Sequence, residues 1–141
     1  MINSRWIWSK QQYLPSEVTS GYPILQELLG QLEDADWNQH DVFGVHLAVE
    51  EALVNAIKHG NRYDESKQVH IACKLAPDLV RVEITDEGHG FDPADVPDPT
   101  ADENLDNPSG RGIMLMRSFV NIQYNDAGNQ VTLEKHRSDG T

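Results

Sequence analysis

The chain has 141 residues, a length that suits one globular domain whose core can fold without disulfides or metals. Hydrophobic residues make up 38% and charged residues 24% of the sequence, which is ordinary for a soluble protein. The net charge of −12 argues against direct binding to nucleic acid, because phosphates require a basic surface. The lone Cys73 excludes a disulfide or a cysteine metal site within the chain and favours a reducing, cytoplasmic location. No apolar run near the N-terminus is long enough for a signal peptide or a membrane span.

The first elements predicted along the chain are a strand and a helix. Residues 5–14 are rich in aromatic and aliphatic side chains, which predicts a strand that would suit a sheet edge. Apolar residues recur at helical spacing over 18–32 and predict a helix. Pro23 places the start of this helix nearby, because proline is tolerated in the first turn.

A longer helix is predicted next. Asn38 and Asp41 resemble a capping box at its start, with aspartate in the place of the usual glutamate. Apolar residues over 42–57 form one stripe along this helix. Gly60, directly after His59, predicts the C-terminal end of this helix.

Two strands and a loop follow the long helix. Alternation of apolar and polar residues predicts strands at 69–75 and 80–84, with Pro77 and Asp78 marking the turn between them. Residues 91–109 contain six acidic residues and no lysine or arginine, and they are rich in proline and asparagine. That composition predicts a mobile loop.

The last part of the chain predicts a short helix and a closing pair of strands. The helix is expected at 112–117, and the strands at 120–124 and 130–136. The order of elements indicates an α+β fold, a two-layer sandwich with helices on one face of a mixed, mostly antiparallel sheet.

Glu51 and Asn55 share one face of the long helix. At about 100° per residue they lie about 40° apart, whereas Glu50 and Asn55 lie about 140° apart. The face lies roughly opposite the apolar stripe. A carboxylate there would either line a cleft covered by another segment or face solvent, and the residues alone leave both interpretations open.

Asp86 continues the alternation of 80–84 and is therefore predicted to point into the buried layer. A buried carboxylate needs hydrogen-bond donors, and the alternatives are an adenine amino group or a backbone or serine group. Gly88 and Gly90 follow at once, as if a flat ring approached the backbone closely. Asp-x-Gly-x-Gly also occurs in ordinary turns.

Gly110, Arg111 and Gly112 precede the predicted short helix. Backbone N–H groups at a helix N-terminus that follows glycines bind phosphate well, and the alternative is a loop end before an apolar helix. Taken together, a base, a magnesium ligand, an inward-pointing acid and two glycine loops predict a nucleotide site.

Three segments have now been described: the helix end with Glu51 and Asn55, the segment 86–90 and the segment 110–112. In their order and spacing they resemble the stand-alone serine/threonine kinases that act as anti-sigma factors. Those proteins belong to the ATPase superfamily of gyrase, Hsp90, histidine kinases and MutL, which has the Bergerat-type ATP-binding fold. The resemblance extends roughly from Trp37 to Lys135 and implies a single histidine-kinase-like ATPase domain over 1–141. The matching positions are Glu51, Asn55, His59, Gly60, Asp86, Gly88, Gly90, Gly110 and Gly112.

The resemblance implies that the cofactors are ATP and Mg²⁺. Asn55 would supply its side-chain oxygen to Mg²⁺, a cation that prefers oxygen ligands. Glu51 would be the general base for the attacking hydroxyl. Asp86 would accept a hydrogen bond from the adenine amino group, and Gly88 and Gly90 would form the floor of the adenine pocket.

Further roles are implied for the remaining positions. Residues 91–109 would be the lid over the phosphates, which Gly110 to Ile113 would hold. Arg111 would either neutralise developing charge in phosphoryl transfer or face a protein partner. His59 would be a neighbour of the ligand or a packing residue at the helix end. Related proteins carry a threonine or serine near the start of the last strand, and Thr132 is one candidate for that position.

The resemblance implies an ATP-dependent serine protein kinase that acts as an anti-sigma regulatory factor. It would phosphorylate a small antagonist protein and sequester a sigma factor, with no membrane or direct nucleic-acid contact. The alternative is an ATP-binding regulatory switch with little or no phosphoryl transfer, which the acidic lid favours. The catalytic half of a histidine kinase is disfavoured, because no phosphoacceptor helix pair precedes the site. A homodimer is also implied, and Trp6, Trp8 and Tyr13 would lie at its interface or in the core.

Overall fold

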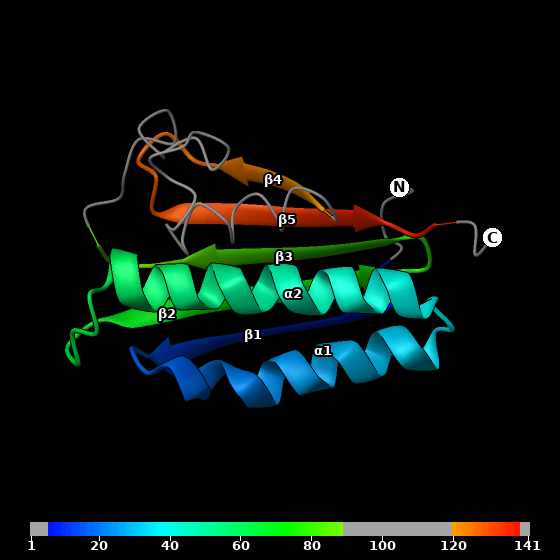
Figure 1. The fold of residues 1–141 in the computed structure, drawn as a ribbon, viewed down its shortest axis with the longest axis horizontal. Coiled ribbons are helices and arrows are strands. Elements are labelled where there is room, and N and C mark those ends of the chain that lie inside the picture. Colours follow the sequence, from blue (N-terminus) through cyan, green and yellow to red (C-terminus); the bar gives the residue numbers. More distant parts are fainter. Residues whose placement is uncertain (1–5, 89–119, 139–141) are drawn as a thin grey trace, which may run out of the picture.

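The computed structural model describes residues 6–88 and 120–138 (Figure 1). The loop expected at 91–109 and the helix expected at 112–117 lie outside these residues. The described elements are β1 (Trp8–Pro15), the 3₁₀ turn η1 (Val18–Gly21), α1 (Tyr22–Asp34), α2 (Gln39–Asn55), the π-helical turn η2 (Ala56–Gly60), β2 (Gln68–Ala76), β3 (Leu79–Thr85), β4 (Asn121–Tyr124) and β5 (Gln130–His136).

The strands form one five-stranded sheet in the order β1-β2-β3-β5-β4. Every pair of neighbouring strands is antiparallel, so the prediction of a mostly antiparallel sheet is confirmed, and the described strands contain no parallel pair. β1 lies at one edge of the sheet, as its sequence suggested, and β4 lies at the other.

Both α-helices cover the same face of the sheet and lie side by side (Figure 1). The core between the two layers takes alternate residues of β2 and β3, and the residues between them lie on the other face. Burial of this apolar surface stabilises the two layers by roughly 25 cal/mol per Å². The predicted α+β two-layer sandwich is therefore confirmed.

The helix predicted over 18–32 divides into two parts. Residues Val18–Gly21 form the tighter turn η1, and α1 begins at Tyr22 with Pro23 in its first turn. Proline fits there because the first N–H groups of a helix have no partner within the helix. No helix of the described part is long and apolar enough to cross a membrane.

The predicted cap at the start of α2 is confirmed for Asn38, whose Oδ1 accepts a hydrogen bond from the backbone N–H of Asp41 at 2.8 Å. The capping-box role of Asp41 is wrong. Its carboxylate instead accepts hydrogen bonds from the backbone N–H and the hydroxyl of Ser138, at 2.8 and 2.7 Å. Asp41 has this different partner because, in the tertiary structure, the C-terminal segment lies against the start of α2.

The end of α2 also differs from the prediction. The helix widens into the π-helical turn η2, in which the N–H of Asn61 donates to the carbonyl of Ala56 at 2.8 Å. The chain then reverses through left-handed φ angles at Arg62 (53°) and Tyr63 (59°). The helical segment therefore ends at Gly60, as predicted, although Gly60 itself does not adopt a left-handed φ.

Candidate functional site

The C-terminal ends of α2 and β3 meet at one end of the molecule (Figure 1). A Cβ atom on Gly60 would lie 2.3 Å from Cγ of Asp86, and one on Gly88 would lie 2.0 Å from the carbonyl oxygen of Gly60. Any side chain larger than glycine would clash at both positions. The structure thus brings together three residues that the sequence placed in two separate motifs.

Asp86 lies on the helix-facing side of the sheet, as its alternation predicted, and its side chain is only 9% exposed. Its Oδ1 accepts a hydrogen bond from the N–H of Gly88 at 2.8 Å. Burial raises the pKa of this carboxyl, and the Gly88 hydrogen bond and the charge of Lys67 only partly oppose that effect. No described residue donates to Oδ2, so this oxygen is a ready acceptor for a ligand amino group.

Asn61 is a buried residue of this site that the sequence interpretation missed. Its side chain is 1% exposed, and its Oδ1 accepts a hydrogen bond from the N–H of Glu87 at 2.8 Å. Its Nδ2 donates to Oγ of Ser16 at 3.1 Å and to the carbonyl of Gln68 at 3.0 Å. The only sequence signal was a polar residue directly after a helix-ending glycine, which usually indicates an exposed turn.

Glu51 and Asn55 lie on one partly exposed face of the last turns of α2. Partial burial and the neighbouring charge of Glu50 raise the pKa of the Glu51 carboxyl, although Lys58 acts in the opposite direction. No described residue forms a hydrogen bond with the Asn55 side chain, so its oxygen is available to a ligand. These properties fit a general base and an oxygen ligand for a cation.

A metal ion at this end of α2 would need ligands beyond the described side chains. Among residues 6–88 and 120–138, no group of three histidine, cysteine, aspartate or glutamate side chains could hold one. The donor set fits Mg²⁺ bound through Asn55 together with phosphate oxygens, which is how this cation is commonly held.

His59 lies in the π-helical turn beyond Asn55. Desolvation of its ring and the charge of Lys58 lower the pKa of His59 below its usual value. The side chain is therefore largely uncharged at pH 7, so it adds little positive charge for a phosphate.

Thr132 is not brought to the site. It pairs with Glu83 on β3, which puts both residues on the face of the sheet that the helices leave open. The residue next to Asp86 is Asn129, whose carbonyl accepts the Asp86 N–H at 2.9 Å. The Asn129 Nδ2 also approaches the carbonyl of Asp86, at 3.4 Å. The turn at Gly128 (φ 77°) brings Asn129 to this place, and strand alternation excludes Thr132 from it.

The remaining predicted site residues lie outside the described residues. They are Gly90, Gly110, Arg111, Gly112 and Ile113, together with the lid at 91–109.

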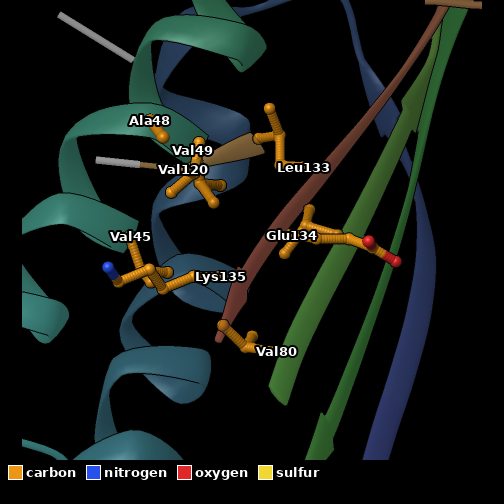
Figure 2. A pocket seen from close by; sticks show the side chains of 9 residues that line it. Val45, Ala48, Val49, Val80, Val120, Leu133, Glu134 and Lys135 are labelled. Atoms are coloured by element: carbon orange, nitrogen blue, oxygen red, sulfur yellow. The ribbon is translucent and has the colours of Figure 1, made fainter. Parts of the chain in front are cut away.

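A hollow lies between α2 and the sheet (Figure 2). It is lined by Val45, Ala48, Val49, Val80, Val82, Val120, Leu133, Glu134 and Lys135. Val80 lies near the start of β3, whereas Asp86 follows the end of that strand. Apart from Glu134 and Lys135 the lining is aliphatic, so the hollow offers few polar groups that would orient a nucleotide.

The N-terminal aromatic residues have different surroundings. Trp8 packs against the core, whereas the Trp6 ring lies 5.7 Å from Nζ of Lys74, on the face of the sheet that is not covered by helices. Tyr13 is 66% exposed and its ring centroid lies 4.7 Å from that of His70. Trp6 and Tyr13 therefore lie on the open face of the sheet, whereas Trp8 packs against the core.

Known proteins share this sequence pattern and fold. The family described as histidine kinase-like ATPase domain matches residues 14–135. The anti-sigma F factor of Clostridium perfringens is 32% identical over 98 residues, which cover 64% of this chain and 69% of that protein. The serine-protein kinase RsbW of Staphylococcus aureus is 28% identical over 120 residues, covering 77% of this chain and 74% of that protein.

A solved structure supports the fold independently. The RsbU and RsbW domains of Rv1364c from Mycobacterium tuberculosis match with a TM-score of 0.60 at 18% identity. The match covers 93% of this chain and 33% of that longer chain. The predicted α+β fold class is therefore confirmed.

Proposed function

Because the chain belongs to the anti-sigma serine/threonine kinases within the histidine kinase-like ATPase family, we propose that it phosphorylates a serine of a small antagonist protein and sequesters a sigma factor. The observation that carries the proposal is the contact of Gly60 and Gly88 with the buried Asp86. This contact lies at the end of the helix that carries Glu51 and Asn55. An acceptor for a nucleobase and two groups for phosphoryl transfer are thus carried by adjoining elements.

Nucleobase recognition would rest on Asp86. Its Oδ2, to which no described residue donates, would accept a hydrogen bond from the adenine amino group, and Oδ1 is held in place by the N–H of Gly88. Gly60 and Gly88 leave backbone, not side chains, beside the carboxylate, so a flat ring can approach closely. A guanine base presents a carbonyl at the corresponding position and would be repelled by the carboxylate.

Phosphoryl transfer would use Glu51 and Asn55. Mg²⁺, when bound, would neutralise phosphate charge on a protein whose own net charge is −12. As the serine oxygen bonds to the γ-phosphorus and the bond to the ADP oxygen breaks, Glu51 would take the hydroxyl proton. The raised pKa of the Glu51 carboxyl favours proton acceptance in the transition state.

The replacement Glu51→Gln tests this role. We expect phosphoryl transfer to fall by a factor of about 100 or more, while ATP binding persists. Transfer of ³²P to a purified antagonist and calorimetry with Mg²⁺-ATP measure the two quantities. Glu50→Gln is the matched control, because Glu50 lies about 140° around the helix from Asn55. Unchanged transfer in Glu51→Gln would contradict the base assignment.

A regulatory switch without turnover is the second candidate. It is favoured by the six acidic residues and the absence of lysine and arginine in 91–109, since acidic side chains near a triphosphate disfavour catalysis. ATP-dependent binding of a partner, with no ³²P transfer to any antagonist, would support it.

We further propose a cytoplasmic homodimer. The exposed Tyr13 and the partly exposed Trp6 on the open face of the sheet support it, because aromatic residues are enriched at interfaces. Light scattering that shows only monomer at high protein concentration would contradict it.

A further inference from the structure

The loop after β3 is held by hydrogen bonds that the proposed catalytic mechanism does not use. The N–H of Glu87 donates to Oδ1 of Asn61 at 2.8 Å, and the Glu87 carboxylate accepts a hydrogen bond from the N–H of Gln68. Glu87 lies between Asp86 and Gly88, so its position determines the position of both neighbours. Asn61 is the buried side chain that accepts the N–H of Glu87, whereas the Asp86 carboxylate accepts the N–H of Gly88.

The Asn61 side chain uses both of its polar atoms within the protein. Besides accepting from Glu87, its Nδ2 donates to Ser16 and to the carbonyl of Gln68. Ser16 is itself buried, and its hydroxyl donates to the carbonyl of Lys67 at 2.7 Å. A fully satisfied buried amide of this kind has one orientation, because turning it would leave buried groups without partners.

The π-helical turn η2 presents two successive residues to the loop. The backbone of Gly60 packs against the Asp86 carboxylate, and Asn61 holds the N–H of Glu87. The same turn continues directly from Asn55, the last residue of α2. The relative position of the proposed cation ligand and the nucleobase acceptor therefore depends on this turn and on the Asn61 side chain.

We propose that Asn61 is a positioning residue for nucleotide selection, which fixes the 86–88 loop so that Asp86 discriminates adenine from guanine. This inference rests on the proposed ATP-dependent function. Asn61 touches no nucleotide and acts through the N–H of Glu87. The Oδ1 atom of Asn61 holds the loop by accepting the Glu87 N–H, and the hydrogen bond from Nδ2 to Ser16 orients the amide.

The variants Asn61→Ala and Asn61→Asp separate positioning from stability. Asn61→Ala removes the acceptor, so we expect about tenfold weaker ATP binding and a smaller preference for ATP over GTP. Asn61→Asp keeps an oxygen for Glu87 but buries a carboxylate, so it should be less stable yet retain the preference. A purely structural role would make the loss of preference follow the loss of stability. Calorimetry with Mg²⁺-ATP and Mg²⁺-GTP, well below each melting temperature, measures the preference.

Ser16→Ala is the matched control, because it removes one partner of Asn61 and leaves the Glu87 hydrogen bond in place. We expect it to keep the ATP preference. Amide hydrogen exchange of Glu87 in the free protein should be faster in Asn61→Ala and unchanged in Ser16→Ala. If Asn61→Ala does not fold, Asn61→Ser replaces it, since a serine hydroxyl is too short to reach Glu87.

The outcomes distinguish this inference from the function on which it rests. A wild type that binds no ATP would overturn both. Normal ATP preference in a folded Asn61→Ala variant with fast exchange at Glu87 would overturn the positioning role alone. Loss of preference in Asn61→Ala, with preference kept in Asn61→Asp and Ser16→Ala, would support it.

Discussion

At the scale of single residues, Asp86 combines its proposed role as the nucleobase acceptor with a cost in stability. Its carboxyl is buried, and burial raises its pKa above the ordinary aspartate value. An acid with a raised pKa in the folded state stabilises the fold most at low pH, where it is protonated. That contribution is lost as the pH rises through the folded-state pKa, so ionised Asp86 weakens the free protein at neutral pH.

Replacement of Asp86 by asparagine should therefore separate stability from function. In Asp86→Asn we expect a higher melting temperature than in wild type at pH 7, with the difference shrinking as the pH falls below the folded-state pKa. ATP binding should be lost, because the amide has one acceptor oxygen, which Gly88 already occupies. Melting curves across pH and calorimetry with Mg²⁺-ATP measure the two effects. If Asp86→Asn were less stable than wild type at pH 7, the inference that the ionised Asp86 carboxylate destabilises the fold would be wrong.

The pH dependence of phosphoryl transfer should reveal the environment of Glu51. A general base must be deprotonated, so the rate should rise with pH through the raised pKa of Glu51. Since the charge of Glu50 contributes to that rise, Glu50→Gln should move the acidic limb of the pH–rate profile to lower pH and leave the plateau unchanged. A profile that is the same in wild type and Glu50→Gln would count against Glu51 as the titrating group.

At the scale of elements, the junction of α2 and β3 depends on glycine because two backbones approach closely. A methyl group at Gly60 would displace the Asp86 carboxylate, whereas one at Gly30, within α1, would meet nothing within 4 Å. The same substitution should therefore have opposite effects in the two helical segments.

We expect Gly30→Ala to stabilise the protein by about 0.5–1 kcal/mol, because alanine loses less conformational freedom than glycine in a helix. Gly60→Ala should bind ATP at least about tenfold more weakly, since Asp86 must leave its position. Denaturant unfolding and calorimetry on both variants measure these changes. Equal ATP affinity in the two variants would mean that the Gly60–Asp86 contact does not shape the site where ATP binds.

At the scale of the whole molecule, the C-terminal segment is tied to the connection between the two helices. Arg137 donates to the carbonyl of Asp36 at 2.7 Å and its guanidinium lies 5.7 Å from the centroid of the Trp37 ring. Asp41 is fully buried and accepts two hydrogen bonds from Ser138. These contacts join the C-terminal segment to the start of α2, at the opposite end of that helix from the proposed nucleotide site.

The Asp41 carboxylate should make stability depend on pH in the opposite sense to Asp86. Burial alone would raise the pKa of Asp41, but the hydrogen bonds from Ser138 and the charge of Lys135 outweigh it and lower the pKa. An acid with a lowered pKa stabilises the fold above its unfolded-state pKa, and this stabilisation is lost as the pH falls through the folded-state value.

Asp41→Asn should accordingly cost about 1–3 kcal/mol at pH 7, and less as the pH approaches the folded-state pKa from above. Denaturant unfolding at several pH values measures this difference, and ATP affinity should stay unchanged because the site lies at the other end of α2. If the loss of unfolding free energy in Asp41→Asn did not vary with pH, the charge of the Asp41 carboxylate would not be what stabilises this contact.

The sequence by itself determined the elements and the family. Alternation at 69–75 and 80–84 and the helical spacing over 42–57 reflect which side chains are buried, and burial is what the fold optimises. The prediction that Asp86 points into the buried layer followed from the same rule, because side chains alternate between the two faces of a strand. Glu51 and Asn55 shared a predicted face for the equivalent reason in a helix.

Only the tertiary structure decided how separate segments meet. Asn61 reads as an exposed turn residue, yet contacts with Glu87 and Ser16 from distant parts of the chain bury it. The capping role of Asp41 failed because a partner 97 residues away competes for its carboxylate. Local patterns report which face of an element is buried, but not which segment covers it, because long-range hydrogen bonds and close backbone approaches depend on the packed arrangement of all the elements.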